Sequence, residues 1–173
     1  MEAHPEAAVA VLLAKHPVES ILLIRRATNP ADPWSGHWSF PGGRRDDADP
    51  DLLTTALREL DEECSIQLDR EQLTRELPSS YAGKSVGNTI AVAPYLFEIA
   101  EQLQANLNPR EADDYVWTPV ALLADRSRHR WQRIPGFANR AMFPAVDLKG
   151  TPLWGFTYRV LCDLLGIEMP THQ

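Results

Sequence analysis

The sequence has few cysteines and no long apolar run. Its only two cysteines among 173 residues, Cys64 and Cys162, lie far apart in apolar surroundings. We interpret both as small buried hydrophobic residues, which fits a reducing, cytoplasmic location. No stretch approaches the roughly 18 uninterrupted apolar residues that a spanning helix needs, and the N-terminus lacks a signal-peptide pattern. The sequence therefore predicts a soluble protein with no membrane partner.

Positive charge is also scarce. The chain has 17 lysines and arginines against 24 aspartates and glutamates, a net charge of −7, and its pI is about 5.2. Because nucleic acids bind to net basic surfaces, this balance argues against a nucleic-acid partner, whereas a small phosphorylated substrate stays compatible. With no internal repeat or low-complexity tract, residues 1–173 are predicted to form a single domain.

The sequence does contain a dense group of carboxylates at the end of a predicted helix. Asp49 is typical of an N-cap and Pro50 of a first helical position, so the helix is expected to run from Pro50 to about Cys64. Three carboxylates near its C-terminal end fall within an arc of roughly 100° and can point at one small volume. They are Glu59, Glu62 and Glu63.

These carboxylates are electrostatically misplaced. A helix C-terminus carries the negative end of the helix dipole and favours cations by about 0.3 to 1 kcal/mol per charge. Like charges four residues apart, such as those of Glu59 and Glu63, destabilise the helix by roughly a further 0.2 to 0.5 kcal/mol. Bound Mg²⁺ or Mn²⁺ would offset both penalties, since these hard cations take oxygen ligands. The alternative interpretation is an acidic helix end that is merely solvated.

The residues around this helix resemble the box of the Nudix family. That pattern is Gly, five residues, Glu, seven residues, then Arg-Glu-aliphatic-x-Glu-Glu-x-Gly-aliphatic, and here it spans about residues 43–66. The chain departs from it in three places. Asp49 replaces the first glutamate, eight residues instead of seven precede Arg58, and Ser65 stands where the family has glycine.

The resemblance implies a metal site for Mg²⁺ or Mn²⁺. Glu59 and Glu63 match the principal metal ligands of the family, and Glu62 matches a further ligand or a base that orients water. A backbone carbonyl near Gly42 is the expected additional ligand. Arg58 resembles the family arginine that holds a box glutamate by a charge-assisted hydrogen bond.

Other candidate residues lie outside the acidic cluster. The resemblance also implies a catalytic or metal-binding acid from a late loop, and Glu111 is the candidate for this distal carboxylate that accepts a proton, with a solvated loop acid as the alternative. Trp34 and Trp38 are predicted to stack on a nucleobase, with core packing as the alternative. Arg44, which directly follows the two glycines, is a third predicted substrate-binding residue beside Trp34 and Trp38.

The fold expected from the resemblance is the Nudix α/β/α sandwich with a mixed sheet. Apolar patterns and turn signals predict alternating strands and helices. Strands are expected at 7–14, 20–26, 38–40, 77–82, 88–99 and 115–117, and further helices at 119–124 and 153–165, the last ended by Gly166.

The expected reaction is hydrolysis of a diphosphate linkage in a nucleoside diphosphate joined to another moiety. The extra residue before Arg58, Leu22-Leu23 and Phe143-Pro144 resemble the coenzyme A pyrophosphatases, so coenzyme A or a derivative is the leading substrate. The alternatives are ADP-ribose, nucleotide sugars or nucleoside triphosphates, or a nucleotide sensor without catalysis. A homodimer is possible on general grounds.

Overall fold

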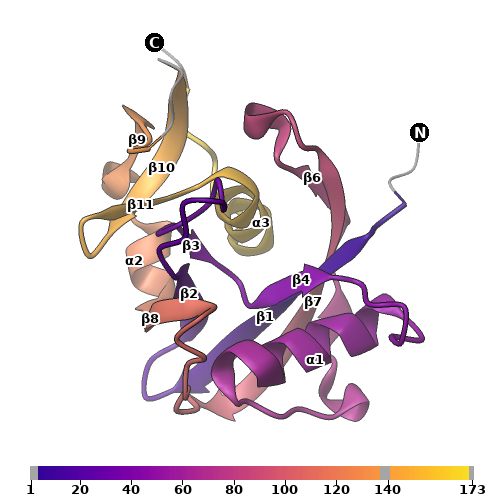
Figure 1. The fold of residues 1–173 in the computed structure, drawn as a ribbon. Coiled ribbons are helices and arrows are strands. Elements are labelled where there is room, and N and C mark those ends of the chain that lie inside the picture. The colour runs from indigo at the N-terminus through magenta and orange to yellow at the C-terminus, as the bar shows by residue number, and fades with distance from the viewer. Residues whose placement is uncertain (1–3, 137–140, 172–173) are drawn as a thin grey trace.

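The computed structural model describes residues 4–136 and 141–171, in which strands and short helices alternate (Figure 1). The strands are β1 (Ala7–His16), β2 (Ser20–Arg26), β3 (Trp38–Ser39), β4 (Gly42–Arg44), β5 (Arg75–Glu76), β6 (Ser80–Ala82), β7 (Ile90–Glu101), β8 (Ala112–Pro119), β9 (His129–Arg133), β10 (Met142–Leu148) and β11 (Thr151–Trp154). The α-helices are α1 (Leu52–Cys64), α2 (Val120–Ala124) and α3 (Gly155–Leu165). Single 3₁₀ turns are η1 (Arg70–Gln72), η2 (Lys84–Val86) and η3 (Arg126–Arg128).

The larger sheet is mixed, as predicted. Its main path runs β3-β2-β1-β7-β5, while β8 pairs with β2, β6 with β7 and β4 with β1. β1 and β7 are parallel over nine paired positions. The other pairs in this sheet are antiparallel. Because β4 pairs with the central strand β1, the glycines of the box are held against the middle of the sheet.

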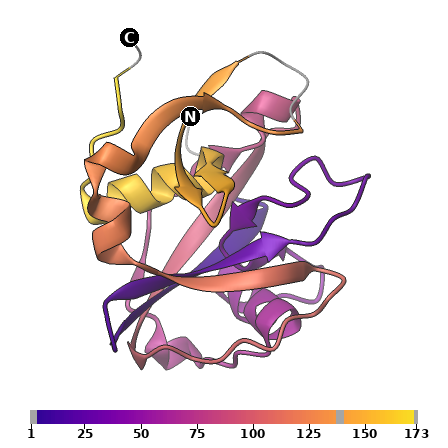
Figure 2. The ribbon, with the colours of Figure 1, turned by 90° about the vertical axis from the view of Figure 1, so that its left-hand side faces the viewer.

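Alternating side chains of the central strands build two separate cores. Residues of β1 and β2 such as Leu12 and Leu22 pack with Leu60 of α1 on one face. Their neighbours Val11 and Ile21 pack with α3 on the other face. This period of two places helices on opposite sides of the sheet (Figure 2). The predicted α/β/α arrangement is confirmed.

Helix α1 begins two residues later than predicted. The N-cap is Asp51, whose carboxylate accepts a hydrogen bond from the Thr54 amide at 2.8 Å, and the helix starts at Leu52. The prediction of Asp49 as N-cap and Pro50 as first helical residue was wrong, because Asp49 is buried and used by another partner. The helix ends at Cys64, as expected.

A second sheet, β11-β10-β9, was not predicted. Its β10–β11 hairpin turns at Lys149 and Gly150, both with positive φ, the conformation that tight hairpin turns require. The closing helix was therefore placed two residues too early: Leu153 lies in β11, and α3 starts at Gly155. The predicted stop at Gly166 is confirmed by its left-handed backbone.

The two cysteines are both buried thiols, as interpreted from the sequence. Burial raises the pKa of the Cys64 thiol to about 12, which makes it unreactive at neutral pH. Across the ranges 4–136 and 141–171, no helix has the length and apolar character to cross a bilayer.

Candidate active site

The candidate site lies where the end of α1 packs against β4. Glu63 is three residues before the end of the predicted box and is only 4% exposed. Its Oε1 accepts a hydrogen bond of 3.0 Å from the amide of Gly42. The backbone of Gly42 also lies against β1, since a Cβ built there would fall 2.6 Å from Cγ1 of Val9 and 2.7 Å from its Cα. Gly42 therefore brings the strand close enough to anchor the Glu63 carboxylate.

The next glycine makes room for a second carboxylate. A Cβ built on Gly43 would lie 2.6 Å from Cδ of Glu59, and still closer to one of its oxygens. Glu59 and Glu63 are one turn apart on α1 and share a face of the helix. The two consecutive glycines thus bring two carboxylates to the same short strand.

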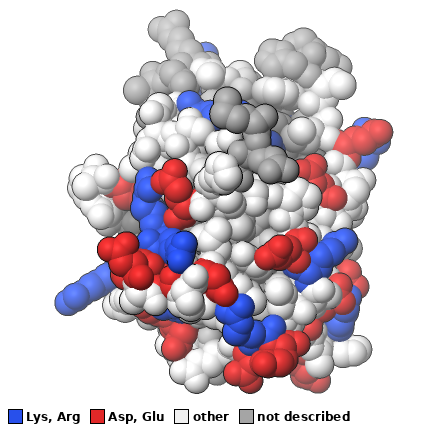
Figure 3. All heavy atoms as spheres, turned by 90° about the vertical axis from the view of Figure 1, so that its right-hand side faces the viewer, with Lys and Arg blue, Asp and Glu red and all other residues white. Residues whose placement is uncertain are grey.

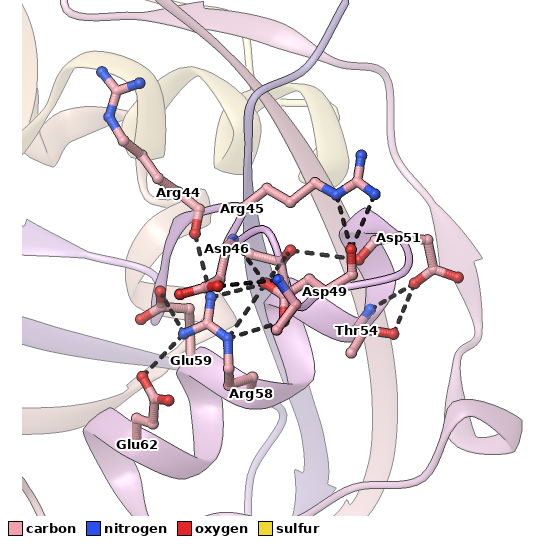
Figure 4. A network of polar contacts seen from close by, with 11 residues as sticks. Arg44, Arg45, Asp46, Asp49, Asp51, Thr54, Arg58, Glu59 and Glu62 are labelled. Carbon is pink, nitrogen blue, oxygen red and sulfur yellow. Dashed lines mark hydrogen bonds and ion pairs between the residues drawn. The ribbon is translucent and has the colours of Figure 1, made fainter.

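Arg58 is held between three carboxylates (Figure 4). Its Nη2 donates to Oδ2 of Asp49 at 2.9 Å, and its Nη1 donates to Glu59 and to Glu62 at 3.0 Å each. Nη2 also donates to the carbonyl of Arg44 at 3.2 Å. Arg58 therefore ties together the loop before α1, β4 and the acidic end of α1.

Asp49 fixes the other side of this arginine. It is buried and accepts further hydrogen bonds from the Asp46 amide at 3.0 Å and the Thr55 hydroxyl at 2.9 Å. These donors and the Arg58 guanidinium hold the pKa of Asp49 well below its usual range. A shorter aspartate in place of the family glutamate therefore still reaches Arg58.

Both site carboxylates are destabilised as anions. Burial is the largest cause that raises the pKa of Glu63, to about 8, and the charge of Glu59 adds to it. Burial likewise raises the pKa of Glu59, although Arg58 acts in the opposite direction. A buried and a half-buried carboxylate that repel each other form a site that favours a cation.

Two further charged residues act on this pair. The charge of Glu111 raises the pKa of both Glu59 and Glu63, so the loop before β8 brings this predicted distal acid near the pair. The loop is fixed by the Asn108 amide, which donates to the Glu63 carbonyl at 3.0 Å. Arg26, at the end of β2, lowers the pKa of Glu63 and was not singled out from the sequence. The sequence did hold a signal for it, since Arg25 and Arg26 are two consecutive arginines at the end of the strand predicted at 20–26.

Glu62 is the most exposed of the three box glutamates. Glu62 is 55% exposed on its side chain, and its carboxylate is turned to Arg58. Among the described residues, no group of three or more histidine, cysteine, aspartate or glutamate side chains is arranged to hold a metal ion. The expectation that Glu59, Glu62 and Glu63 point at one volume stays a prediction. Glu59 and Glu62 accept from the same Nη1 atom of Arg58 at 3.0 Å each, while Glu63 is held by the Gly42 amide.

The remaining carboxylates still fit a magnesium or manganese ion. Mg²⁺ typically takes one or two protein carboxylates and completes its shell with water and substrate phosphates. Glu59 and Glu63 supply that number of hard oxygen ligands, and the raised pKa of Glu63 marks a site that favours positive charge. The Gly42 carbonyl stays a predicted ligand.

The predicted substrate-binding residues have different environments. Trp38 is 2% exposed in the core, and its indole donates to the carbonyl of Leu148 at 3.0 Å. The prediction that Trp38 stacks on a nucleobase was wrong, since no face of it is open to a ligand. Trp34 is half-buried in the loop before β3. Arg44 is exposed, pairs with Glu6 at 3.4 Å and lines an open cavity of about 450 Å³.

Comparison with known families decides what this arrangement belongs to. Residues 3–138 match the family model described as the NUDIX domain. The chain belongs to the Nudix family. The match includes β4, α1 and the loop that carries Glu111, so the carboxylate pair described above lies inside the Nudix domain.

Individual Nudix proteins are only moderately similar. A curated relative from Pectobacterium atrosepticum, named uncharacterized Nudix hydrolase NudL, is 32% identical over 117 residues, which cover 66% of this chain and 57% of the relative. The chain spans about half the length of the curated relatives it matches. The solved structure of the Nudix hydrolase RenU from M. smegmatis is 27% identical, with a TM-score of 0.55 over 80% of this chain and 81% of that one.

A further solved structure carries a ligand. The Nudix domain of NrtR from Shewanella oneidensis, crystallised with ADP ribose, is 23% identical. Its TM-score is 0.55 over 70% of this chain and 76% of that one. At this identity the similarity shows the Nudix fold alone.

Proposed function

We propose that the protein hydrolyses a diphosphate linkage in a nucleoside diphosphate joined to another moiety, with Mg²⁺ or Mn²⁺ as cofactor. The observation that carries this proposal is the buried Glu63 carboxylate, held by the Gly42 amide with Glu59 beside it. Both residues lie on α1, inside the part of the chain that matches the Nudix domain. A buried pair of acids with no metal would be a lasting cost to the fold, whereas a cation that also binds phosphate turns it into a working site.

The chain's own residues would divide the work as follows. Glu59 and Glu63 hold the cation, which, when bound, neutralises the diphosphate and lowers the pKa of attacking water. Arg58, fixed by Asp49, keeps the Glu59 carboxylate in place. Glu62 or Glu111 accepts the proton of the attacking water. Glu62 is exposed and bound only to Arg58 among the described contacts, so it can turn toward a bound substrate.

Coenzyme A or a derivative is the substrate we propose first. The support is the extra residue before Arg58, Leu22-Leu23 and Phe143-Pro144, which resemble the coenzyme A pyrophosphatases of the family. ADP-ribose is the second candidate, because the NrtR Nudix domain binds ADP ribose. Nucleotide sugars and nucleoside triphosphates belong to the same test. A cytoplasmic location and a homodimer stay predictions.

The test is a substrate panel assayed with Mg²⁺ and with Mn²⁺. Product analysis after incubation with coenzyme A, ADP-ribose, nucleotide sugars and nucleoside triphosphates should show 3′,5′-ADP and phosphopantetheine formed fastest. Faster cleavage of another member would reassign the substrate and keep the enzyme. If no member is cleaved with either metal while calorimetry shows tight nucleotide binding, the protein is a sensor and the proposed activity is wrong.

A further inference from the structure

An open cavity of about 320 Å³ lies outside the carboxylate site, between the β6–β7 hairpin, β10 and the start of α3. Its described lining residues are Lys84, Ser85, Phe143, Trp154, Gly155 and Arg159. None of these residues belongs to the box, and within residues 4–136 and 141–171 none forms a hydrogen bond or ion pair with Glu59 or Glu63. Its volume is at the lower end of the range for small-molecule sites.

Two cations face this cavity. Lys84 lies in the turn η2, where its ammonium is 5.4 Å from the centre of the Tyr81 ring. Arg159, on the first turns of α3, donates from Nη2 to the carbonyl of Tyr81 at 2.6 Å. Both side chains are therefore fixed near one residue of β6, and Arg159 keeps other donors for a ligand.

These cations differ from most others on the chain. On the face shown in Figure 3, acidic and basic side chains lie next to one another. Within residues 4–136 and 141–171, however, neither Lys84 nor Arg159 forms an ion pair with a carboxylate. Asp163, one turn further along α3, acts on Arg159 only at longer range. In a chain of net charge −7, two cations without a bound carboxylate at one cavity leave charge for an anion.

The wall beside the cations is aromatic. The rings of Phe143 and Trp154 pack with their centroids 4.9 Å apart. Trp154 is fixed from behind, because its indole donates to Nδ1 of His37 at 3.3 Å. Phe143 is only half-buried and offers apolar surface to the cavity. A Cβ built on Gly155, which also lines the cavity, would meet no described atom within 4 Å apart from its chain neighbours, so there is space at the start of α3.

We infer that this cavity binds a nucleoside monophosphate group, with its planar base against Phe143 and its phosphate between Lys84 and Arg159. A phosphate accepts charge-assisted hydrogen bonds from both cations, and an aromatic wall suits a planar heterocycle. The assignment of this group to the nucleotide end of a substrate rests on the proposed function. The existence of the site does not.

Calorimetric titration of the full chain with AMP, in EDTA so that no divalent cation is present, tests the site apart from catalysis. Wild-type protein should bind AMP more tightly than adenosine or inorganic phosphate alone. Lys84→Ala should weaken AMP binding about tenfold and Lys84→Glu further, because a charge-assisted hydrogen bond is lost. Phe143→Leu, which keeps apolar volume, should weaken it about threefold. Lys15→Ala, which removes an exposed lysine paired with Glu98, should change nothing.

Further arms separate the possible sources of the group. Glu63→Gln should bind AMP as the wild type does in EDTA, so failure of the hydrolase proposal leaves this result standing. If Lys84→Ala raises the KM of the best panel substrate with kcat unchanged, the site holds the nucleotide end of that substrate. If KM is unchanged while AMP binding is lost, the site holds a separate nucleotide. Equal AMP affinity in wild type, Lys84→Ala and Lys84→Glu, or no saturable AMP binding by the wild type, overturns the inference.

Discussion

Gly43 has no room for a side chain, because the carboxylate of Glu59 occupies the space where a Cβ would be. Gly42 is different: a Cβ there would meet the backbone of β1 rather than the mobile end of a side chain. Two adjacent glycines therefore have separate roles. One allows the sheet to form and anchors Glu63 through its amide, and the other places Glu59.

Substitution should separate these two roles. Gly43→Ala is expected to lower kcat/KM about 100-fold, since a displacement of a catalytic group by about 1 Å has that effect. Its free energy of unfolding, measured with urea, should fall by less than about 1 kcal/mol, because the Glu59 side chain can move aside. Gly42→Ala should instead lower the free energy of unfolding by about 3 kcal/mol or prevent folding, since the backbone of β1 would have to shift. A fully active Gly43→Ala protein would show that the position of Glu59 does not matter.

The raised pKa of Glu63 predicts how stability depends on pH. The folded state holds this proton up to about pH 8, whereas an unperturbed glutamate loses it near 4.5. The folded state therefore binds more protons than the unfolded state between these values, and the metal-free protein loses stability as pH rises through this window. Because Mg²⁺ binds the carboxylate form, the rise in melting temperature on adding Mg²⁺ should be larger at pH 8 than at pH 6.

Thermal denaturation at both pH values, with EDTA and with Mg²⁺, checks this expectation. Other groups also titrate in the window, so the matched Glu63→Gln protein supplies the baseline. In EDTA, the melting temperature of the wild type minus that of Glu63→Gln should fall as pH rises, because only the wild type loses the Glu63 proton. A difference that stays constant with pH would mean that Glu63 is an ordinary, ionised carboxylate in the folded protein.

At the scale of residues, the sequence predicted the role of a charged residue better than it predicted whether a side chain is buried. Arg58 was predicted to hold a box glutamate, and the structure shows it 3.0 Å from Glu59. Trp38 was wrongly predicted to meet a substrate, because sequence does not tell whether an aromatic residue beside a turn faces the core. The contact between Glu62 and Arg58 could not be predicted either, since it depends on where Asp49 holds Arg58.

At the scale of elements, the end of α1 shows a compromise at one residue. Ser65 stands where the family has glycine and adopts a left-handed backbone with φ 53°. Its amide donates to the Asp61 carbonyl at 2.8 Å, and its hydroxyl donates to the Asn106 carbonyl at 3.1 Å. The substituted box therefore keeps the turn, and the serine side chain ties α1 to the loop that leads to Glu111.

Two substitutions isolate the backbone strain at Ser65. Both Ser65→Ala and Ser65→Gly remove the hydroxyl bond, but only glycine relieves the left-handed conformation, which costs other residues about 1 kcal/mol or more. We expect the glycine variant to be more stable than the alanine variant by about 1 kcal/mol in urea denaturation. Equal stability, or a more stable alanine variant, would mean that the helix ends differently in solution.

The start of α1 shows why element boundaries were harder to predict than element types. Asp49 and Asp51 both precede the helix, and both are good N-cap residues. The choice was decided by tertiary contacts, because Asp49 is drawn to Arg58, nine residues away, and leaves the cap to Asp51. Local propensity alone contains no information about such a partner.

At the scale of the whole molecule, the central strands were predictable because their apolar patterns are long. β1 and β2 are buried on both faces, and the helices that cover those faces follow from the two cores. The sheet β9–β10–β11 was missed because β9 and β11 are short, and β9 and β10 are partly exposed without a clear apolar alternation. Its Lys149-Gly150 turn was the one local signal that a hairpin was present.

The carboxylate pair depends on this whole arrangement, since Gly42 comes from β4 and Glu63 from α1. The most direct test is Mg²⁺-dependent hydrolysis of the best panel substrate by Glu63→Gln, with Asp61→Asn as the matched control. Asp61 is a carboxylic acid on the same helix, but its side chain accepts a hydrogen bond from Gln67, outside the site. Turnover should fall at least about 1000-fold in Glu63→Gln, with folding intact by circular dichroism, and stay near wild type in Asp61→Asn. Wild-type turnover by a folded Glu63→Gln protein would contradict the proposed site.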